Sequence, residues 1–547
     1  MSLRKHQREF ETTINKIANG LNIRTIYCHV TPGGGKSILP IIAGRLIGFA
    51  NRADKLCWIA PRLSLINQAE REFINPYFRH FLGHELEIRS STNENNPSRN
   101  LNGFATTYNA VGMDEGILES EFERYRYILI MDEFHHVALE SVWHAALAPL
   151  FRLAAVRVMM TGTCERGDGQ KIAFMPYRQN GCGLVPDLKD TPDTAVIRYT
   201  RADALAERAI IPLAFHLSDG QASWQTRAGQ VKKVQSLDRM SDFDATKALY
   251  TALRTEYAED LLKAGLAHWQ EHRKTNPEAK CLVVCSDIKQ AERHTKNLKE
   301  WGLTRLDIAT SDDSASALKA INKMKAGRLD VLVTVAMAYE GLSIPAVSHI
   351  ICLTRIRSTP WIEQMTARAN RIDPNGGPYD QQIGHIFAPA DPLFKEIVSR
   401  IEAEQLPILQ QRQRAKDERD RSENEGFSLE CAPGGITPLS SAMTGNREVI
   451  LNGNMEISTR TASEIEAELR KAIEEHVNLY AYQNRYNPKR LNGELYEHFG
   501  KPRREMTIAE LQECERYIKR VWPLSYIRGT GRPRVPTKAK PFACEWK

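Results

Sequence analysis

Short apolar runs alternate with amphipathic stretches along the first third of the chain. The apolar runs have the length of buried strands, whereas two longer stretches, residues 37–52 and 64–78, have helical periodicity. Strands that alternate with helices predict a parallel sheet covered by helices, and ligands collect at the carboxyl ends of such strands. The predicted strands lie at residues 24–30, 56–61, 103–108, 125–133 and 157–163.

A second block with the same alternation follows, and its predicted strands lie at residues 281–286, 306–311, 329–335 and 347–355. Its last predicted helix covers residues 361–372. Between the blocks, residues 164–245 are less regular, and the runs 171–178, 195–200 and 210–217 predict strands of a connecting sheet. A helical pattern then covers residues 245–274. Two similar blocks in tandem indicate an α/β fold that is built twice.

The character of the chain changes after residue 390. Residues 408–426 are charged and helix-like, residues 427–460 are rich in Gly, Ser, Asn and Thr, and residues 462–523 regain helical periodicity. Within this last stretch, Thr507 and Glu510 have the spacing of an N-cap residue and its capping-box partner. We therefore expect a linker followed by a small helical module.

Composition excludes several classes of protein. The 547-residue chain is 42% hydrophobic and 26% charged, which excludes wholesale disorder and a collagen-like fibre. The longest apolar run, residues 38–50, is interrupted by Arg45 and is too short for a membrane span. The N-terminal residues have no apolar signal core, so we expect a cytoplasmic location. The ten cysteines form no CxxC pair, so we expect reduced core thiols and no cysteine metal site.

The positive charge is concentrated at one end. Residues 501–547 hold 12 Lys and Arg against 5 Asp and Glu, and the other residues hold 62 of each sign. A basic segment on a neutral body suggests a polyanion partner such as nucleic acid. A solvated tail without a partner fits the charge equally well.

A glycine-rich loop follows the first predicted strand and precedes a predicted helix. Glycines let the backbone wrap phosphate groups, and the next helix would point its N–H groups at them. In this pattern the lysine reaches the β- and γ-phosphates of a nucleotide, and the serine hydroxyl binds Mg²⁺. The alternative is a glycine turn that binds no ligand. The loop consists of Thr31, Pro32, Gly33, Gly34, Gly35, Lys36 and Ser37.

A second candidate feature is an apolar strand that ends in two carboxylates, Asp132 and Glu133. Transfer of a phosphoryl group to water needs a held Mg²⁺ and a positioned water molecule. Asp132 suits the metal, and Glu133 suits the base that orients or deprotonates the water. The neighbouring His135 and His136 are not expected to form a metal pair, because adjacent side chains point in different directions.

A third feature lies in the second block. Gln364, Arg368 and Arg371 have i, i+4 and i+7 spacing, so we expect them on one face of a helix. A guanidinium group aimed at a γ-phosphate would stabilise the charge of the transition state. The alternative is a solvated basic face.

The motifs and their order resemble helicase superfamily 2 in its DExH branch, closest in style to DNA repair and restriction-type motors. The resemblance implies that Gln7, in the segment LRKHQ, contacts adenine. Three positions depart from the pattern: Ser343 stands for Asp, Ala367 for Gly, and Cys164 for Pro. None of them removes a phosphate-binding or metal-binding group. The further matching segments are residues 31–37, 60–68, 106–108, 132–135, 161–163, 285–286, 309–311, 334–345 and 364–371.

The resemblance implies two tandem RecA-like P-loop domains with parallel sheets, plus a small, mostly α-helical C-terminal domain. ATP and Mg²⁺ would bind between the domains, and the catalytic set would be Lys36, Asp132, Glu133, Gln364, Arg368 and Arg371. The expected divisions are residues 1–200 (ATP-binding domain), 201–400 (second domain), 401–460 (charged helix and linker) and 461–547 (helical domain with basic tail).

The resemblance also places four side chains, Arg62, Thr107, Thr310 and Thr334, on the face that binds the nucleic-acid strand. Hydroxyl groups and a guanidinium group can bind phosphates, but these contacts carry no sequence information. We therefore expect sequence-tolerant, salt-sensitive binding. DNA is favoured over RNA by analogy alone, since no residue is assignable to the 2′-hydroxyl group.

Three functions remain open: a DNA helicase or translocase, the motor subunit of a phage-defence or restriction-like complex, and an ATP-dependent DNA clamp or remodeller that does not unwind. An RNA helicase is less favoured. The helical module would bind DNA or dock a protein partner. For DNA, Tyr480, Tyr482 and Tyr486 could stack on bases beside a basic turn at residues 501–504. Alternatively, the tyrosines pack the core of the module and the basic residues are solvated.

Overall fold

The computed structural model describes residues 3–49, 52–91, 93–114, 116–181, 183–226, 230–239, 242–310, 314–335, 344–425 and 460–524. Several predicted features lie outside these residues. They are the linker at 427–459, the basic tail from 525 onward, and the motif positions 311 and 336–343 with Ser343 among them. Among the described residues, no helix combines the length and apolar composition needed to cross a bilayer.

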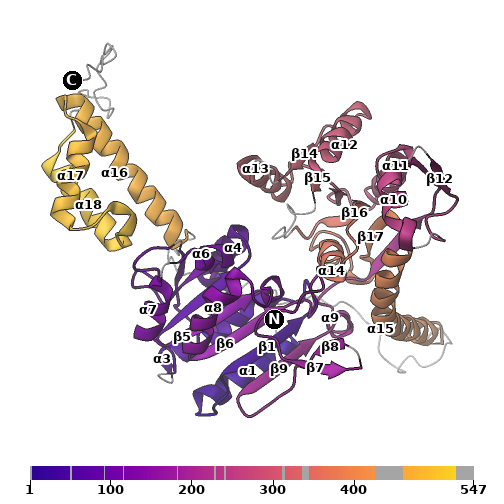
Figure 1. Cartoon of the computed structure of the whole chain (residues 1–547), viewed down its shortest axis with the longest axis horizontal. Helices are drawn as coiled ribbons and strands as arrows, with labels where there is room; N and C mark the ends of the chain where they lie inside the picture. Colours follow the sequence, from indigo (N-terminus) through magenta and orange to yellow (C-terminus); the bar gives the residue numbers. More distant parts are fainter. Residues whose placement is uncertain are drawn as a thin grey trace, which may run out of the picture.

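The N-terminal lobe, residues 3–206, is built on a seven-stranded sheet in the order β3-β4-β2-β5-β6-β1-β9. All neighbouring strands are parallel, and helices cover the sheet (Figure 1). The strands are β1 (Thr25–Val30), β2 (Lys55–Ala60), β3 (Ile88–Ser90), β4 (Gly103–Thr107), β5 (Tyr127–Asp132), β6 (Val156–Thr161) and β9 (Thr194–Tyr199). The helices are α1 (Lys5–Ala18), η1 (Lys36–Ile38), α2 (Leu39–Ala43), α3 (Leu46–Phe49), α4 (Leu63–Ile74), α5 (Pro76–Leu82), α6 (Tyr108–Gly112), α7 (Ile117–Arg124), η2 (Phe134–His136), α8 (Val142–Leu153) and α9 (Arg201–Ala206).

The second lobe, residues 213–425, has a six-stranded parallel sheet in the order β10-β17-β16-β13-β15-β14. Its strands are β10 (Leu213–Ser218), β13 (Lys280–Cys285), β14 (Leu306–Ala309), β15 (Val331–Val335), β16 (Val347–Leu353) and β17 (Gly384–Pro389). Its helices are α10 (Asp242–Ala252), α11 (Glu256–His272), α12 (Ile288–Glu300), α13 (Ser314–Lys325), α14 (Thr359–Thr366), η3 (Tyr379–Gln381) and α15 (Pro392–Glu425). Two antiparallel hairpins, β7 (Tyr177–Asn180) with β8 (Gly183–Pro186) and β11 (Ala222–Gln225) with β12 (Val231–Val234), extend from the lobes. Two parallel sheets in tandem confirm the predicted α/β fold.

The predicted connecting sheet does not form. Residues 194–199 are β9 and pair with β1 at the edge of the first sheet, whereas 213–218 are β10 and pair with β17 at the edge of the second. Each apolar run finds a larger parallel sheet to extend, which buries it more completely than a separate small sheet would. The chain crosses between the lobes at residues 207–212.

Two predicted helices are interrupted. The helix predicted at 37–52 is divided into η1, α2 and α3, because Gly35 precedes it in a left-handed conformation and Gly48 takes a φ of 85° within its last turn. The helical pattern at 245–274 forms α10 and α11, and the break lies before Thr255, which is extended and precedes the first residue of α11.

The C-terminal module comprises α16 (Ala462–Asn484), α17 (Pro488–Phe499), η4 (Arg503–Glu505) and α18 (Ile508–Val521), around a small apolar core of its own. The predicted capping box of Thr507 and Glu510 is confirmed at the start of α18. The module projects from the N-terminal lobe on the side away from the second lobe (Figure 1). It is attached through α4 and β3, where the Ser463 amide donates to Glu70 at 2.8 Å and Arg71 pairs with Glu464 at 2.9 Å.

A buried charge cluster reinforces this attachment. Glu466 of α16 accepts hydrogen bonds from Arg89 at 3.1 Å, from Arg99, and from Arg470 at 2.6 Å, and Arg89 also contacts Glu94. The Glu466 and Arg99 side chains are 3% and 2% exposed. Arg99 further donates to the backbone carbonyl groups of the turn before α18. We call Arg89, Glu94, Arg99, Glu466 and Arg470 the Glu466 cluster.

Candidate active site

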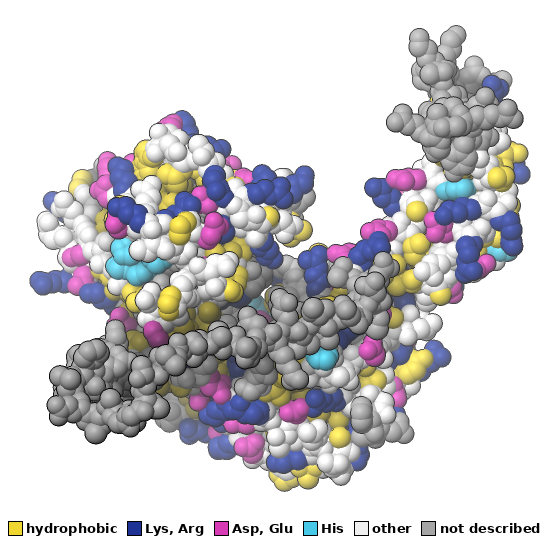
Figure 2. Space-filling view, turned by 180° about the vertical axis from the view of Figure 1, so that it is seen from behind, with side chains coloured by type: hydrophobic (Ala, Val, Ile, Leu, Met, Phe, Trp, Pro, Cys, Tyr) yellow, Lys and Arg dark blue, Asp and Glu magenta, His cyan; other side chains and the backbone are white. Residues whose placement is uncertain are grey.

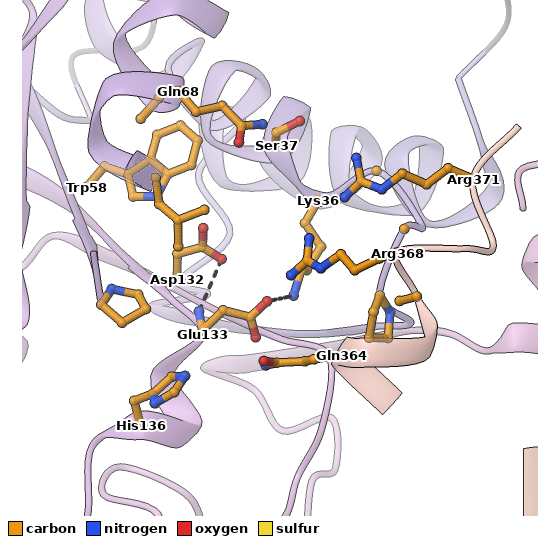
Figure 3. Close-up of a pocket in the computed structure, with 17 residues that line it drawn as sticks. Lys36, Ser37, Trp58, Gln68, Asp132, Glu133, His136, Gln364, Arg368 and Arg371 are labelled. Carbon is orange, nitrogen blue, oxygen red and sulfur yellow. Dashed lines mark hydrogen bonds and ion pairs between the residues drawn. The ribbon is translucent and has the colours of Figure 1, made fainter. Parts of the chain in front are cut away.

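A cavity of about 220 Å³ lies between the two lobes (Figure 3). The N-terminal lobe contributes the glycine loop and the end of β5, and the second lobe contributes α14 and the residues that follow it. Nine of the predicted site residues line this one cavity: Gly33, Gly35, Lys36, Ser37, Asp132, Glu133, Gln364, Arg368 and Arg371.

The glycine loop depends on two glycines for its shape. Gly33 and Gly35 have φ values of 84° and 92°, in the left-handed region that other residues avoid. A Cβ atom on Gly33 would lie 2.9 Å from the amide oxygen of Asn370, and one on Gly35 would lie 2.8 Å from the Arg4 guanidinium group. Both backbone conformation and close approach therefore require glycine at these positions.

Three predicted nucleotide-binding residues lie beside the cavity without lining it. Gln7 is buried and donates from Nε2 to the Gly35 carbonyl oxygen at 3.1 Å. The Gly34 carbonyl oxygen accepts a hydrogen bond from Arg4 at 2.6 Å, and Thr31 is buried at the start of the loop. In this conformation Gln7 stabilises the glycine loop through its hydrogen bond to the Gly35 carbonyl oxygen. Arg4, which sequence reasoning missed, shares this role.

Lys36 and Glu133 form an ion pair across the cavity (Figure 3). Glu133 has a φ of 47°, an uncommon conformation for a residue other than glycine and one that often marks functional sites. Its second carboxyl oxygen accepts from the Gly162 amide at 3.3 Å. Burial works to raise the pKa of Glu133, but the Lys36 ammonium group and His135 hold it well below its ordinary value.

The pKa of Asp132 is shifted in the opposite direction. Burial, reinforced by the neighbouring Glu133 carboxylate, raises the pKa of Asp132 to about 7, although Lys36 opposes the shift. The Trp58 indole lies beside this carboxyl group (Figure 3). Two adjacent carboxyl groups are thus held in different states, which is a common arrangement where two acids have two roles.

A chain of polar contacts joins this strand end to the second lobe. His135 Nδ1 lies 2.9 Å from the Thr161 hydroxyl group, and Thr161 donates to the Thr163 carbonyl oxygen at 2.7 Å. On its other side, His135 Nε2 lies 3.5 Å from the Gln364 amide nitrogen. His135 therefore acts as a contact between the lobes.

The predicted helix that carries Gln364, Arg368 and Arg371 is shorter than expected. α14 ends at Thr366, and both arginines lie in the turns that follow. After the helix, the Asn370 carbonyl oxygen accepts from the Ile211 amide at 2.8 Å, a tertiary contact that the sequence pattern does not reveal. Both arginines nevertheless line the cavity. Burial and the adjacent Arg368 lower the pKa of Arg371 to about 9, so a bound anion there would be stabilising.

Sequence reasoning missed several residues in the cavity or beside it. Asn370 donates to the Pro32 carbonyl oxygen at 3.4 Å and so joins the second lobe to the glycine loop. Its position inside the arginine motif was the available signal. Trp58 and Gln68 line the cavity itself, on β2 and α4, and Gln68 lies at the end of a motif that was assigned to strand binding.

The residues present fit a divalent cation with oxygen ligands. The Ser37 hydroxyl group and the Asp132 carboxyl group both line the cavity, and hard oxygen donors of this kind suit Mg²⁺. Ser37 also contacts Glu72, and burial raises the pKa of that carboxyl group. The cavity also has three cationic side chains, Lys36 from the first lobe and Arg368 and Arg371 from the second, and these suit a polyphosphate.

The predicted strand-binding residues fall into two neighbouring pairs. Arg62 and Thr107 follow the carboxyl ends of β2 and β4, which pair side by side. Thr107 accepts from the Ala110 amide at 3.1 Å as the N-cap of α6. Thr310 follows β14 beside Thr334 of β15, and Thr334 is buried, with its hydroxyl group donating to the Val335 carbonyl oxygen. Thr334 is therefore withdrawn from the surface in this conformation.

Two domain models match the chain in order. The model described as "Type III restriction enzyme, res subunit" matches residues 1–166, and "Helicase conserved C-terminal domain" matches residues 258–373. The first match contains the glycine loop and β5, and the second contains Gln364, Arg368 and Arg371.

Individual relatives are distant. An uncharacterized protein of Mycobacterium tuberculosis, Rv2917, is 24% identical over 459 residues, which cover 82% of this chain and 73% of the relative. The helicase Lhr of Mycobacterium smegmatis, solved with single-stranded DNA and AMP-PNP, has a TM-score of 0.44 and 15% identity over 73% of this chain. The Type ISP restriction-modification enzyme LlaBIII, solved with DNA, has a TM-score of 0.45 and 13% identity over 71% of this chain. The chain spans 50% and 28% of these two solved chains.

The tandem parallel sheets and the two ordered domain matches define the class: this chain is a superfamily 2 helicase of the restriction-type and DEAD/DEAH kind. It is an ATP-hydrolysing enzyme and a nucleic-acid helicase or motor.

Proposed function

We propose that this enzyme is a DNA-directed translocase or helicase that binds ATP in the cavity between its lobes. One observation carries the proposal: Lys36 and the two carboxylates come from the first lobe, whereas Arg368 and Arg371 come from the second. A triphosphate held by both groups of residues would make lobe closure depend on the nucleotide. Hydrolysis and release would then let the lobes separate, which is the kind of motion that can drive movement along a strand.

The Lys36–Glu133 ion pair represents the resting arrangement in this proposal. When a triphosphate binds, the Lys36 ammonium group turns to the phosphates, because they offer more negative charge than one carboxylate. The pKa of Glu133 then rises, since Lys36 is a main cause of its depression. Glu133 becomes a better base for the attacking water, and only when substrate is present.

Ser37 and Asp132 would hold Mg²⁺, which supplies charge stabilisation to the β- and γ-phosphates when bound. Gln364 would help to place the attacking water, since it contacts His135 next to Glu133. Arg368 and Arg371 would stabilise the charge that develops on the γ-phosphate. Gln7, Thr31 and Gly34 would keep the loop in its phosphate-binding shape.

We propose that DNA binds across the carboxyl edges of both sheets, at Arg62, Thr107 and Thr310. The adjacency of β2 with β4 and of β14 with β15 supports this placement, because each lobe then offers a phosphate contact. Thr334 would contribute only after a local rearrangement. The choice of DNA over RNA rests on analogy.

A second candidate function is the motor subunit of a restriction-like complex. The match of residues 1–166 to a restriction-enzyme subunit model favours it. Within the described ranges, the one group of three or more His, Cys, Asp and Glu residues suited to a metal contains only histidines. In this candidate function, a separate subunit would cut the DNA.

ATPase assays with single-stranded DNA, duplex DNA and matched RNA would test the proposal. We expect stimulation by DNA, loss of turnover in Lys36→Ala, and a turnover-deficient Glu133→Gln variant that still binds ATP. Displacement of a triplex-forming strand without separation of a duplex would indicate translocation alone. Stimulation by RNA and not by DNA would contradict the assignment of substrate.

A further inference from the structure

Five of the 15 histidines gather in the second lobe, and none of these five lines the nucleotide cavity. The sheet contributes three of them, from adjacent strands, and α11 contributes two. A histidine patch is visible on the surface of this lobe (Figure 2). The five are His216 on β10, His349 on β16, His385 on β17, and His268 and His272 on α11.

The fold brings these side chains to one face of the sheet. His349 and His385 are direct partners across β16 and β17, and β10 pairs with the other side of β17. His268 and His272 are four residues apart, so they share one face of α11. That face is turned to the sheet, since the His268 ring lies 5.1 Å from His349 and 4.6 Å from His385 between centroids.

Three of the histidines are arranged as a ligand set. One ring nitrogen each of His216, His268 and His385 lies within 4.8 Å of the others, and all three side chains are partly exposed. His216 Nε2 and His385 Nδ1 are 3.1 Å apart. Ligand nitrogens of a tetrahedral zinc site are roughly 3.3 Å apart, given metal–nitrogen bonds of about 2.0 Å, so small ring movements suffice.

His349 lies behind this set, fully buried. Its Nε2 atom is 2.9 Å from His268 Nδ1, and its Nδ1 atom is 2.8 Å from the Ser348 hydroxyl group. A ligand histidine is normally oriented by a partner on its second nitrogen, and His349 occupies that position for His268. The opposite nitrogen of His268 is then the one directed to a metal.

The donor atoms of the histidines determine which metal ion suits the site. The three proposed ligands each offer one imidazole ring nitrogen. Imidazole nitrogens favour Zn²⁺ and related transition metals, whereas Mg²⁺ prefers oxygen. This site would therefore not compete for the Mg²⁺ of the nucleotide cavity.

We propose that His216, His268 and His385 bind one divalent transition-metal ion of the Zn²⁺ class, with His349 as a positioning residue and a fourth position open to solvent. The metal would tie α11 to β10 and β17. Since β10 is the edge strand through which the chain enters the second lobe, the expected role is to stabilise that lobe, separately from ATP hydrolysis.

The test uses the full chain after treatment with a chelator and desalting. Wild type should bind one equivalent of Zn²⁺, and Co²⁺ should give the intense visible bands of a four-coordinate site. Saturating Zn²⁺ should raise the unfolding temperature by about 5 °C or more. His216→Gln and His385→Gln should each weaken binding at least about 10-fold, and His349→Gln should weaken it about 10–100-fold. His80→Gln, at an exposed position on α5, is the matched control and should bind as wild type does.

Circular dichroism would establish that each variant is folded. The Co²⁺ spectrum is measured on the wild-type protein, so it tests the proposal even if a variant does not fold. Absence of four-coordinate Co²⁺ bands in wild type would overturn the proposal. Equal Zn²⁺ affinity in wild type, His216→Gln and His385→Gln would overturn it as well.

Discussion

The nucleotide cavity and the Glu466 cluster contain the same kinds of side chain in two different arrangements. Both bury carboxylates among cationic side chains, and both involve the N-terminal lobe. In the Glu466 cluster, one carboxylate accepts from three arginines that converge on it. In the cavity, the cations line a volume large enough for a ligand.

One arginine of each region shows how its neighbours act on its pKa. Burial alone would lower the pKa of Arg89, but Glu94 and Glu466 raise it above its ordinary value. Burial lowers the pKa of Arg371, and there the neighbouring Arg368 lowers it further. An anion that binds beside Arg371 would offset this repulsion, whereas Arg89 already has two carboxylates beside it.

Helix α4 belongs to both regions. Leu65, Gln68 and Ala69 line the cavity, and the next two residues, Glu70 and Arg71, hold the C-terminal module. The α4 residues that line the nucleotide cavity therefore lie within one helical turn of the α4 residues that attach the module.

The largest effect is expected from Arg368→Ala. Loss of an arginine that stabilises the transition state typically lowers kcat by about 10³–10⁵-fold. Steady-state ATPase assays with saturating DNA would measure it. Arg152→Ala, at an exposed position of α8, is the control and should retain wild-type kcat. A fall of less than about 10-fold in Arg368→Ala would remove this arginine from the catalytic set.

Glu133→Gln should lower kcat by about 10²–10⁴-fold, because the amide cannot accept a proton. Binding of ATP should persist, since Lys36 loses its intramolecular partner and remains available to phosphates. Fluorescent nucleotide titration beside the ATPase assay would separate binding from turnover. Near-normal turnover would show that another group is the base.

Glu466→Gln should release the C-terminal module from the N-terminal lobe. Removal of one partner from a buried ion cluster costs about 3–5 kcal/mol, because the arginines left behind lose their counter-charge. Hydrogen exchange along the first turns of α16 and in β3 should increase. Glu468→Gln, two residues away and exposed, is the matched control. Unchanged exchange in Glu466→Gln would mean that the cluster does not hold the module.

Arg62→Ala should have the smallest effect of the four. Loss of one phosphate contact should weaken DNA binding severalfold and reduce the slope of log affinity against log salt by about 1. DNA-stimulated ATPase should fall while basal ATPase stays constant. Equal loss of both rates would place Arg62 in the nucleotide site instead.

The sequence was sufficient to predict the two parallel sheets and nine residues of the cavity, because strand–loop–helix patterns and charged strand ends are local signals. It did not predict where β9 and β10 would pair, since both are short apolar runs whose partners lie in different sheets. It overestimated the length of the helix at 361–372, since α14 ends at Thr366 and the turns after it make tertiary contacts such as the one between Asn370 and Ile211.

Tertiary contacts that the sequence does not reveal also decide the arrangement of the C-terminal module and of the five histidines. Of the predicted stacking tyrosines, Tyr480 packs against the core of the module and stacks against Tyr486 and Trp522, whereas Tyr482 and Tyr486 are exposed. Lys501 pairs with Glu510 at 2.7 Å, and Arg503 donates to Asn492 at 2.9 Å. The five histidines are scattered over 170 residues of sequence, and only the order of the strands brings them together.

The most direct test of the central claim is a structure of the protein with a non-hydrolysable ATP analogue. The account predicts that the triphosphate lies between the two lobes, with Lys36 moved from Glu133 to the phosphates and Arg368 and Arg371 directed at the γ-phosphate. A triphosphate bound away from this cavity, or one contacted by the N-terminal lobe alone with both arginines turned away, would contradict it.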